Sequence, residues 1–107
     1  MNAETLKGHL DLLLLAAIQT GPAHGYALAE RLHARSNGLF DLPEGTLYPA
    51  LHRLEHAALV SSRWSEVSGR RRRVYQLTAK GRRALEQRHE EWREFARAVH
   101  GVVEDLA

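Results

Sequence analysis

The sequence contains no cysteine, which excludes a disulfide framework and a thiolate metal site. Long apolar runs are also missing, since the longest one, residues 12–18, is too short to cross a bilayer. Residues 1–5 lack the basic stretch of a signal peptide. There is no Gly-x-Ser-x-Gly motif, no His-Glu-x-x-His motif and no phosphate-cradling loop. We therefore expect a cytoplasmic protein that is not an enzyme and that uses no cofactor or metal ion.

Positive charge is concentrated in one segment of the chain. Residues 61–83 carry eight basic side chains and a single acidic one, Glu66, whereas the segments on either side carry more acidic than basic residues. The net charge of the whole chain is therefore only +2. Such a patch favours binding of a polyanion such as nucleic acid, although a solvated surface loop has the same composition. The basic residues are Arg63, Arg70, Arg71, Arg72, Arg73, Lys80, Arg82 and Arg83.

Apolar residues at helical spacing predict two helices in the first third of the chain. The first runs from about residue 5 to residue 20, and its apolar surface is so wide that we expect burial on more than one side. A Gly-Pro pair ends it. The second covers residues 24–35, with Tyr26 in its apolar stripe, and ends at residues 36–38, where Asn or Gly can adopt the left-handed conformation.

A third helix is predicted over residues 46–57. Thr46 is its expected N-cap, and Pro49 then falls at the third helical position, whose N–H has no partner within the helix. The residues expected to face the core are Leu47, Leu51, Leu54 and Ala58. The residues expected to point outward are Tyr48, His52, Arg53 and His56.

A β-hairpin is predicted after the third helix. Residues 59–64 and 72–77 have strand-like composition, and residues 67–70 form the turn between them. Four consecutive arginines, residues 70–73, lie at the tip and on the returning strand. Trp64 closes the first strand, and we expect it to pack in the core or at the base of the hairpin.

The last helix is expected to begin after Thr78, its N-cap, and to continue to the end of the chain. At about 1.5 Å per residue it is roughly 40 Å long, which the head of the molecule cannot cover. Apolar residues recur in it every seven residues, a pattern that favours a partner helix. We therefore divide the chain into a head, residues 1–78, and a dimerisation helix, residues 79–107. The expected dimerisation residues are Leu85, Trp92, Phe95, Val99, Val102 and Leu106.

The order helix, helix, helix, strand, strand, helix indicates a mainly α (α+β) winged helix-turn-helix with a two-stranded wing. Three motifs in this order resemble those of PadR family transcriptional regulators, in the short form with a single C-terminal helix. They are His24-Gly25-Tyr26; Gly45-Thr46-Leu47-Tyr48-Pro49-Ala50-Leu51 with Arg53-Leu54-Glu55; and Gly69-Arg70-Arg71 with Tyr75-Gln76-Leu77-Thr78 and Gly81. One departure is Ala57-Ala58, which stands where the family often has an acidic residue and Gly. The resemblance implies a DNA-binding regulator, by family habit a repressor.

An α-helix fits the major groove of DNA, and the third helix is the expected reader. Its expected DNA contacts are Thr46, Tyr48, Pro49 and Arg53. Tyr48 has the alternative of a half-buried packing residue, and Arg53 that of an ion pair with a nearby carboxylate. The expected wing contacts are Arg70, Arg71 and Arg72. A homodimer would place two third helices about 34 Å apart, so we expect a pseudo-palindromic operator.

Trp92, His52 and His56 each allow two interpretations. Trp92 is either an aromatic anchor of the dimer interface or, as the resemblance to short PadR-like regulators implies, part of a pocket for a hydrophobic aromatic effector that releases the DNA. His52 and His56 are one helical turn apart, as in some metal sites, but no acidic or cysteine ligand lies at matching spacing, which favours exposed or phosphate-facing histidines.

An alternative function is a winged-helix interaction module whose arginines bind an acidic protein partner. The discriminating property is affinity for short DNA duplexes at moderate salt. Binding of single-stranded RNA is disfavoured, because the wing lacks an exposed aromatic platform in this interpretation.

Overall fold

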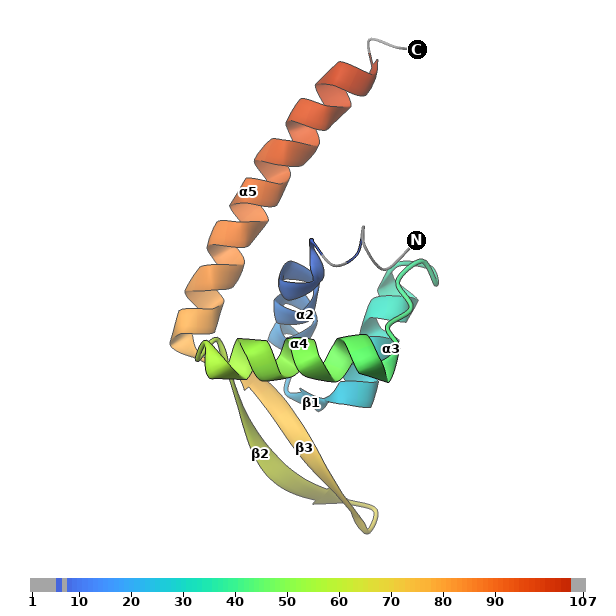
Figure 1. The fold of residues 1–107 in the computed structure, drawn as a ribbon, viewed down its shortest axis with the longest axis vertical. Helices are drawn as coiled ribbons and strands as arrows, with labels where there is room; N and C mark the ends of the chain where they lie inside the picture. The colour runs from blue at the N-terminus through green and yellow to red at the C-terminus, as the bar shows by residue number, and fades with distance from the viewer. Residues whose placement is uncertain (1–5, 7, 105–107) are drawn as a thin grey trace.

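The computed structural model describes residue 6 and residues 8–104 (Figure 1). Its elements, in chain order, are α2 (Leu10–Gln19), β1 (Ala23–His24), α3 (Gly25–Arg35), α4 (Glu44–His56), β2 (Val60–Val67), β3 (Arg70–Leu77) and α5 (Ala79–Glu104). The three shorter helices form the head, from which the β2–β3 hairpin and α5 extend in opposite directions (Figure 1). The molecule is therefore elongated, measuring 55 × 28 × 21 Å. The predicted winged helix-turn-helix with a C-terminal helix is confirmed.

The strands form one antiparallel sheet in the order β1-β3-β2. In the β2–β3 hairpin, which we call the wing, Trp64 lies opposite Arg73. The sheet has one strand more than the sequence predicts. This additional strand, β1, has only two residues, and so short a strand shows no alternation of apolar and polar positions. It pairs with β3 and so holds the start of α3 against the base of the wing.

The core lies where the three helices of the head meet the base of the sheet. Helix α2 is buried on more than one side, as predicted, with Leu14 and Leu15 both completely inaccessible to solvent. Its predicted start is wrong, because a turn at Gly8 and His9 precedes the helix, while Thr5 lies outside the described residues. Helix α4 contributes the expected apolar residues, Leu47, Leu51 and Leu54.

The C-terminal end of α2 is stabilised by a side chain from α3. The Arg31 guanidinium donates hydrogen bonds to the carbonyl oxygens of Ala17 and Gly21, at 3.0 and 2.7 Å. The last carbonyl groups of a helix have no partner within the helix and carry a partial negative charge, so a cation is favoured there. Since α2 has no basic residue in its own last turn, Arg31 supplies this charge from the next helix.

The beginning of α4 differs from the prediction. The helix starts at Glu44, with Pro43 in extended conformation as its N-cap, and the N–H groups of Thr46 and Leu47 donate to the Pro43 carbonyl. Thr46 is therefore not the N-cap, and Pro49 is the sixth helical residue rather than the third. At that position proline leaves the Gly45 carbonyl without its helical donor. Gly45 is exposed, so water can take the place of that donor.

The end of α4 explains why Ala58 is exposed and not in the core as predicted. Ala58 has a φ of +62°. The N–H of Leu59 donates to the Leu54 carbonyl at 2.9 Å, and that of Ala58 to the Glu55 carbonyl at 2.9 Å. These two bonds form a Schellman motif, whose left-handed residue is usually glycine. Alanine at this position is strained, because its Cβ crowds the backbone.

Replacing Ala58 by glycine is therefore expected to stabilise the protein by about 1 kcal/mol, since the left-handed conformation costs glycine little. Thermal or urea unfolding measures the change. The matched control is Ala57→Gly, at the preceding residue with a φ of −80°, which is expected to be neutral or destabilising. An Ala58→Gly variant less stable than the parent would show that the strain is absent.

Helix α5 begins as predicted. The Thr78 hydroxyl accepts a hydrogen bond from the Gly81 N–H at 2.9 Å, which is the N-cap interaction. The same hydroxyl donates to the Ala58 carbonyl at 2.7 Å and joins the start of α5 to the end of α4. The early part of α5 packs on the head, where Leu85 is buried, and the rest projects beyond it.

Candidate nucleic-acid interface

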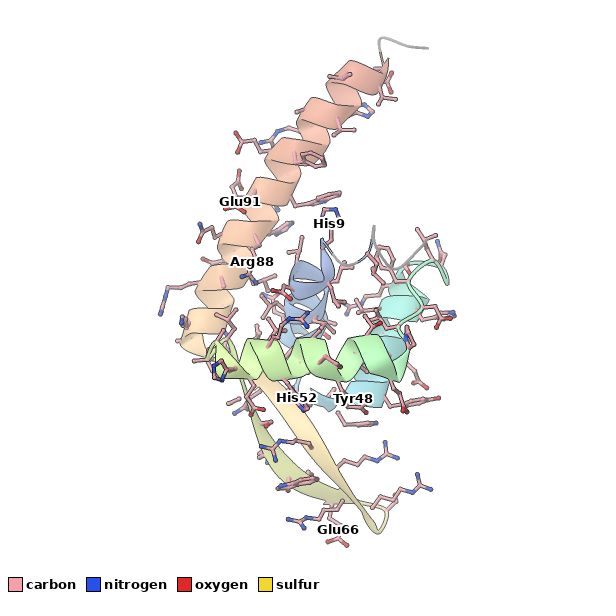
Figure 2. All side chains as sticks on the ribbon, viewed as in Figure 1. His9, Tyr48, His52, Glu66, Arg88 and Glu91 are labelled. Atoms are coloured by element: carbon pink, nitrogen blue, oxygen red, sulfur yellow. The ribbon has the colours of Figure 1, made fainter. Side chains whose placement is uncertain are left out.

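The outward face of α4 lies on the wing side of the head. His52, His56 and Pro49 are exposed, and Tyr48 is 36% exposed. Figure 2 shows Tyr48 and His52 on the side of α4 from which the wing projects. The helix and the wing therefore present side chains to the same side of the molecule.

Tyr48 packs on one side and is open to solvent on the other. A Cβ placed on Gly25 would lie only 2.7–2.9 Å from the Tyr48 ring, so the ring lies directly over the Gly25 backbone. Gly25 is buried at the start of α3, and any side chain there would displace the tyrosine. This contact gives a physical reason for glycine at this place in the first motif. The packing alternative for Tyr48 is thus correct for one edge of the ring and leaves its exposed edge available.

Arg53 and Thr46 lie toward the other flank of α4. Arg53 is exposed and lines a hollow of about 540 Å³ with Asp11, Arg88 and Trp92, between α4, α2 and α5. Figure 2 shows Arg88 on α5, away from the wing. Within the described part of the chain no ion pair of Arg53 is formed, so the alternative of a fixed salt bridge finds no support. Thr46 is half-buried in the first turn of α4.

The wing presents two different faces. Since directly opposed residues of an antiparallel pair point to the same face, the register divides the wing side chains into two sets. One set points to the face that carries buried Tyr75 at its base: Trp64, Glu66, Arg71 and Arg73. The other set points to the opposite face: Arg63, Ser65, Arg70 and Arg72.

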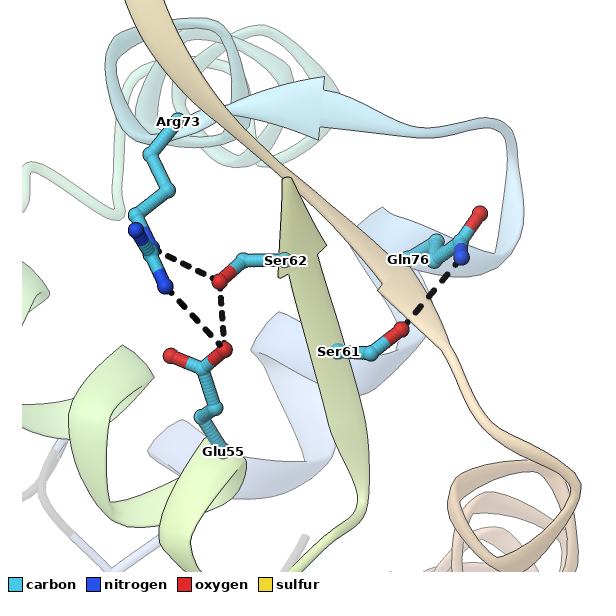
Figure 3. Close-up of polar contacts among 5 residues, drawn as sticks. All are labelled: Glu55, Ser61, Ser62, Arg73 and Gln76. Atoms are coloured by element: carbon cyan, nitrogen blue, oxygen red, sulfur yellow. Dashed lines mark hydrogen bonds and ion pairs between the residues drawn. The ribbon is translucent and has the colours of Figure 1, made fainter. Parts of the chain in front are cut away.

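Arg73 anchors the wing to α4 (Figure 3). Its Nε donates to the Ser62 hydroxyl at 2.7 Å, and its Nη2 lies 3.9 Å from the Glu55 carboxylate. Ser62 in turn donates to Glu55. The guanidinium of Arg73 therefore has protein partners, which sets it apart from Arg70 and Arg71 at the tip, whose guanidiniums form no hydrogen bond or ion pair within the described part of the chain.

Arg72 contacts the start of α3. Its guanidinium donates a hydrogen bond to Nε2 of His24, the N-cap of α3. Burial, and secondly the charge of Arg72, lower the pKa of His24 below its ordinary value of 6.5. The imidazole is therefore neutral at pH 7 and can accept this bond. It lies nearly parallel to the Tyr26 ring, with centroids 6.4 Å apart.

Trp64 and Tyr26 are exposed, contrary to the predictions that placed them in the core or the apolar stripe, and contrary to the expectation that the wing lacks an exposed aromatic side chain. Trp64 is 54% exposed and Tyr26 63% exposed. Trp64 lies in the middle of β2, on the part of the wing that projects beyond the head, where no core reaches it. The guanidinium carbons of Arg71 and Arg73 lie 4.7 and 5.2 Å from its ring centroid.

A hollow of about 570 Å³ opens between the wing and the starts of α3 and α4. Its lining is basic and aromatic, and within the described part of the chain no carboxylate contributes to it. The lining residues are His24, Gly25, Tyr26, Tyr48, Trp64, Arg70, Arg71, Arg72 and Arg73. Of these residues, Tyr48, Arg70, Arg71 and Arg72 are among the contacts that the sequence predicts, whereas Arg73 and the aromatic residues Tyr26 of α3 and Trp64 of β2 are not.

Helix α5 carries a row of exposed apolar residues where it leaves the head. Trp92, Phe95, Val99 and Val102 are 41%, 56%, 42% and 68% exposed. Of the predicted dimerisation residues, Leu85 is buried in the core of its own chain, and Leu106 lies outside the described residues. The rings of Trp92 and His9 meet in a T-shaped arrangement, with centroids 5.2 Å apart, and Trp92 borders a largely apolar hollow of about 480 Å³ between α2 and α5.

Neither a metal centre nor a membrane span is found in the described residues. No group of three or more His, Cys, Asp or Glu side chains is placed to hold a metal ion there. None of the helices there combines the length and apolar character needed to cross a membrane.

Comparisons with known proteins extend over most of the chain. The model of the family described as "Transcriptional regulator PadR-like family" matches residues 14–87. The transcriptional regulator Rv3488 of Mycobacterium tuberculosis is 42% identical over 78 residues, which cover 73% of this chain and 70% of that protein. A PadR family transcription regulator from Clostridium difficile has a similar structure, with a TM-score of 0.78 and 33% identity over 89% of this chain and 98% of that one. A transcriptional regulator from Clostridium thermocellum superposes with a TM-score of 0.84, at 26% identity over 92% and 96% of the two chains.

Proposed function

Since the chain belongs to the PadR-like family of transcriptional regulators, we propose that it represses transcription by binding a pseudo-palindromic operator as a homodimer. The observation that carries the proposal is the common orientation of the outward face of α4 and the basic wing (Figure 2). Between them lies a hollow lined by arginine and aromatic side chains, which is complementary to the phosphates of a DNA strand.

In this proposal α4 enters the major groove. Pro49, Thr46 and the free edge of Tyr48 face the bases or the groove wall, and His52 lies among them on the exposed surface. Arg53, on the flank nearer α5, contacts the backbone. The wing arginines Arg70, Arg71 and Arg72 contact phosphates, where their planar donors suit the oxygens.

The dimer forms through the part of α5 that leaves the head. Trp92, Phe95, Val99 and Val102 make a continuous exposed apolar row, which a second α5 can cover. Leu85 belongs to the head, so we assign the interface to Trp92 and the residues after it, Leu106 included. We keep the functional division into a DNA-binding head, residues 1–78, and a C-terminal helix, residues 79–107, whose first turns pack on the head through Leu85 and whose later part forms the dimer. Such a regulator acts in the cytoplasm.

A hydrophobic aromatic effector is the proposed release signal. Trp92 is one of the residues that line the apolar hollow between α2 and α5, so a bound planar compound would lie against both the head and the proposed dimer helix. Titration of a Trp64→Phe variant, in which Trp92 is the single tryptophan, with planar hydrophobic compounds is expected to quench the tryptophan fluorescence. If no such compound changes the fluorescence, Trp92 acts as a packing residue alone.

The DNA-binding proposal is tested by neutralising the tip of the wing. The double substitution Arg70→Gln and Arg71→Gln is expected to weaken binding to all duplexes by roughly similar factors and to flatten the salt dependence, because each lost phosphate contact lowers the slope by about one. The measurement is a binding titration at several salt concentrations.

The matched control removes the same charge elsewhere. Arg82→Gln with Arg83→Gln neutralises two exposed arginines at the start of α5, outside the hollow, and is expected to leave the slope nearly unchanged. An unchanged slope for the wing variant would contradict a role of the wing in DNA binding. If the unmodified chain bound an acidic protein but no duplex, the interaction-module alternative would replace the proposal.

A further inference from the structure

Burial in the core does not explain why residue 64 is a tryptophan. It is 54% exposed in the middle of a hairpin that projects from the head. A large aromatic side chain gains most of its stabilisation by leaving water, and here about half of it remains in contact with water. The exposed ring is instead partly covered by cations, since the guanidiniums of Arg71 and Arg73 lie over it.

The two arginines on the indole have different remaining partners. Arg73 is opposite Trp64 in the hairpin register and is held by Ser62 and Glu55. Arg71 is the diagonal neighbour on the same face, 4.7 Å from the ring centroid. In the described part of the chain no hydrogen bond or ion pair of the Arg71 guanidinium is formed.

Stacking orders an arginine without using its donors. A guanidinium that lies on an aromatic face keeps its N–H groups in its own plane, directed away from the ring. Both Trp64 and Arg71 line the basic hollow beside α4, where the N–H edge of Arg71 can meet a phosphate. A side chain that is already ordered loses less conformational entropy on binding, so the contact is stronger.

We propose that Trp64 is a positioning residue for DNA binding, which holds the Arg71 guanidinium ready to bind a backbone phosphate in the hollow between the wing and α4. This inference rests on the proposed DNA-binding function. Arg73 also lies over the Trp64 ring. Because Ser62 and Glu55 hold its guanidinium, Arg73 fixes the position of the indole relative to α4.

The test uses the full chain, a mixed-sequence duplex of about 30 base pairs, and four variants: Trp64→Leu, Trp64→Phe, Arg71→Gln, and Trp64→Leu with Arg71→Gln. Trp64→Leu is expected to weaken binding by about tenfold, because leucine offers no π face to the cation. Trp64→Phe keeps a weaker π face, so its affinity for the duplex is expected to lie between those of the parent and Trp64→Leu. The double variant is expected to bind no more weakly than Arg71→Gln alone, since the indole acts through Arg71.

A merely structural role gives a different pattern. If Trp64→Leu bound the duplex as tightly as the parent, or lost as much affinity in the Arg71→Gln background as in the parent, the positioning role would be overturned. If Trp64→Leu did not fold, the same comparison with Trp64→Phe would decide. A parent chain that bound no duplex would instead contradict the proposed function itself.

Discussion

Replacing Phe95 and Val99 by glutamate is expected to convert the protein to a monomer and to lower its affinity for a two-half-site operator by a factor on the order of 10² or more. Both residues are exposed on the part of α5 that leaves the head, in the middle of the proposed interface. Two carboxylates from each copy would have to be buried without partners, which is costly. Because neither residue belongs to the core of the head, the variant is expected to remain folded.

The control for this experiment carries the same change in net charge. Arg97→Glu also changes the charge by two units, on the opposite surface of α5, and is expected to leave both the mass and the affinity nearly unchanged. Light scattering gives the mass, and a titration with operator DNA gives the affinity. A Phe95/Val99 variant that remained dimeric, or a monomeric one with undiminished affinity, would contradict the proposed assembly.

Replacing Gly81 by alanine is expected to destabilise the protein by roughly 3 kcal/mol or more, the range of severe single substitutions. A Cβ at Gly81 would lie 1.9 Å from the Leu59 carbonyl oxygen, which is backbone and cannot move aside. The first turn of α5 would have to separate from the end of α4, breaking the Thr78 bridge between them. This contact explains physically why the third motif contains glycine here.

Gly101→Ala is the matched control, because it makes the same substitution in the same helix. Nothing lies within 4 Å of a Cβ built at Gly101, so alanine there is expected to stabilise α5 by about 1 kcal/mol. Thermal unfolding compares the two variants. A Gly81→Ala protein that melted within a few degrees of the parent would show that α5 does not approach α4 as closely as described.

The parts of the fold that were predicted correctly are those with a repeated or local signal. Leu47, Leu51 and Leu54 recur at helical spacing, and they lie in the core. Thr78 has the residue type and position of an N-cap, and its hydroxyl accepts the expected bond. The errors arise where contacts with a neighbouring segment determine where a helix begins or ends. Residue type alone does not show that Pro43 rather than Thr46 precedes α4, or that Ala58 closes a Schellman motif.

The candidate site was predictable in its charge and less so in its geometry. The arginine run indicated a basic wing, but only the hairpin register separates Arg71, on the Trp64 face, from Arg70 on the other. Residue type favours packing for Trp64, because most tryptophans are largely buried, and its strand alone does not reveal that the wing extends past the core. Similarly, the contact between Tyr48 and Gly25 joins two helices and leaves no local pattern.

The proposed dimer is tested most directly by selection of bound duplexes from a random pool by the full chain. Paired α4 helices are expected to enrich a pseudo-palindrome whose half-sites are centred about one helical turn apart, or near 34 Å. Enrichment of a single asymmetric half-site, or of no sequence, would contradict a dimer that reads DNA through paired α4 helices.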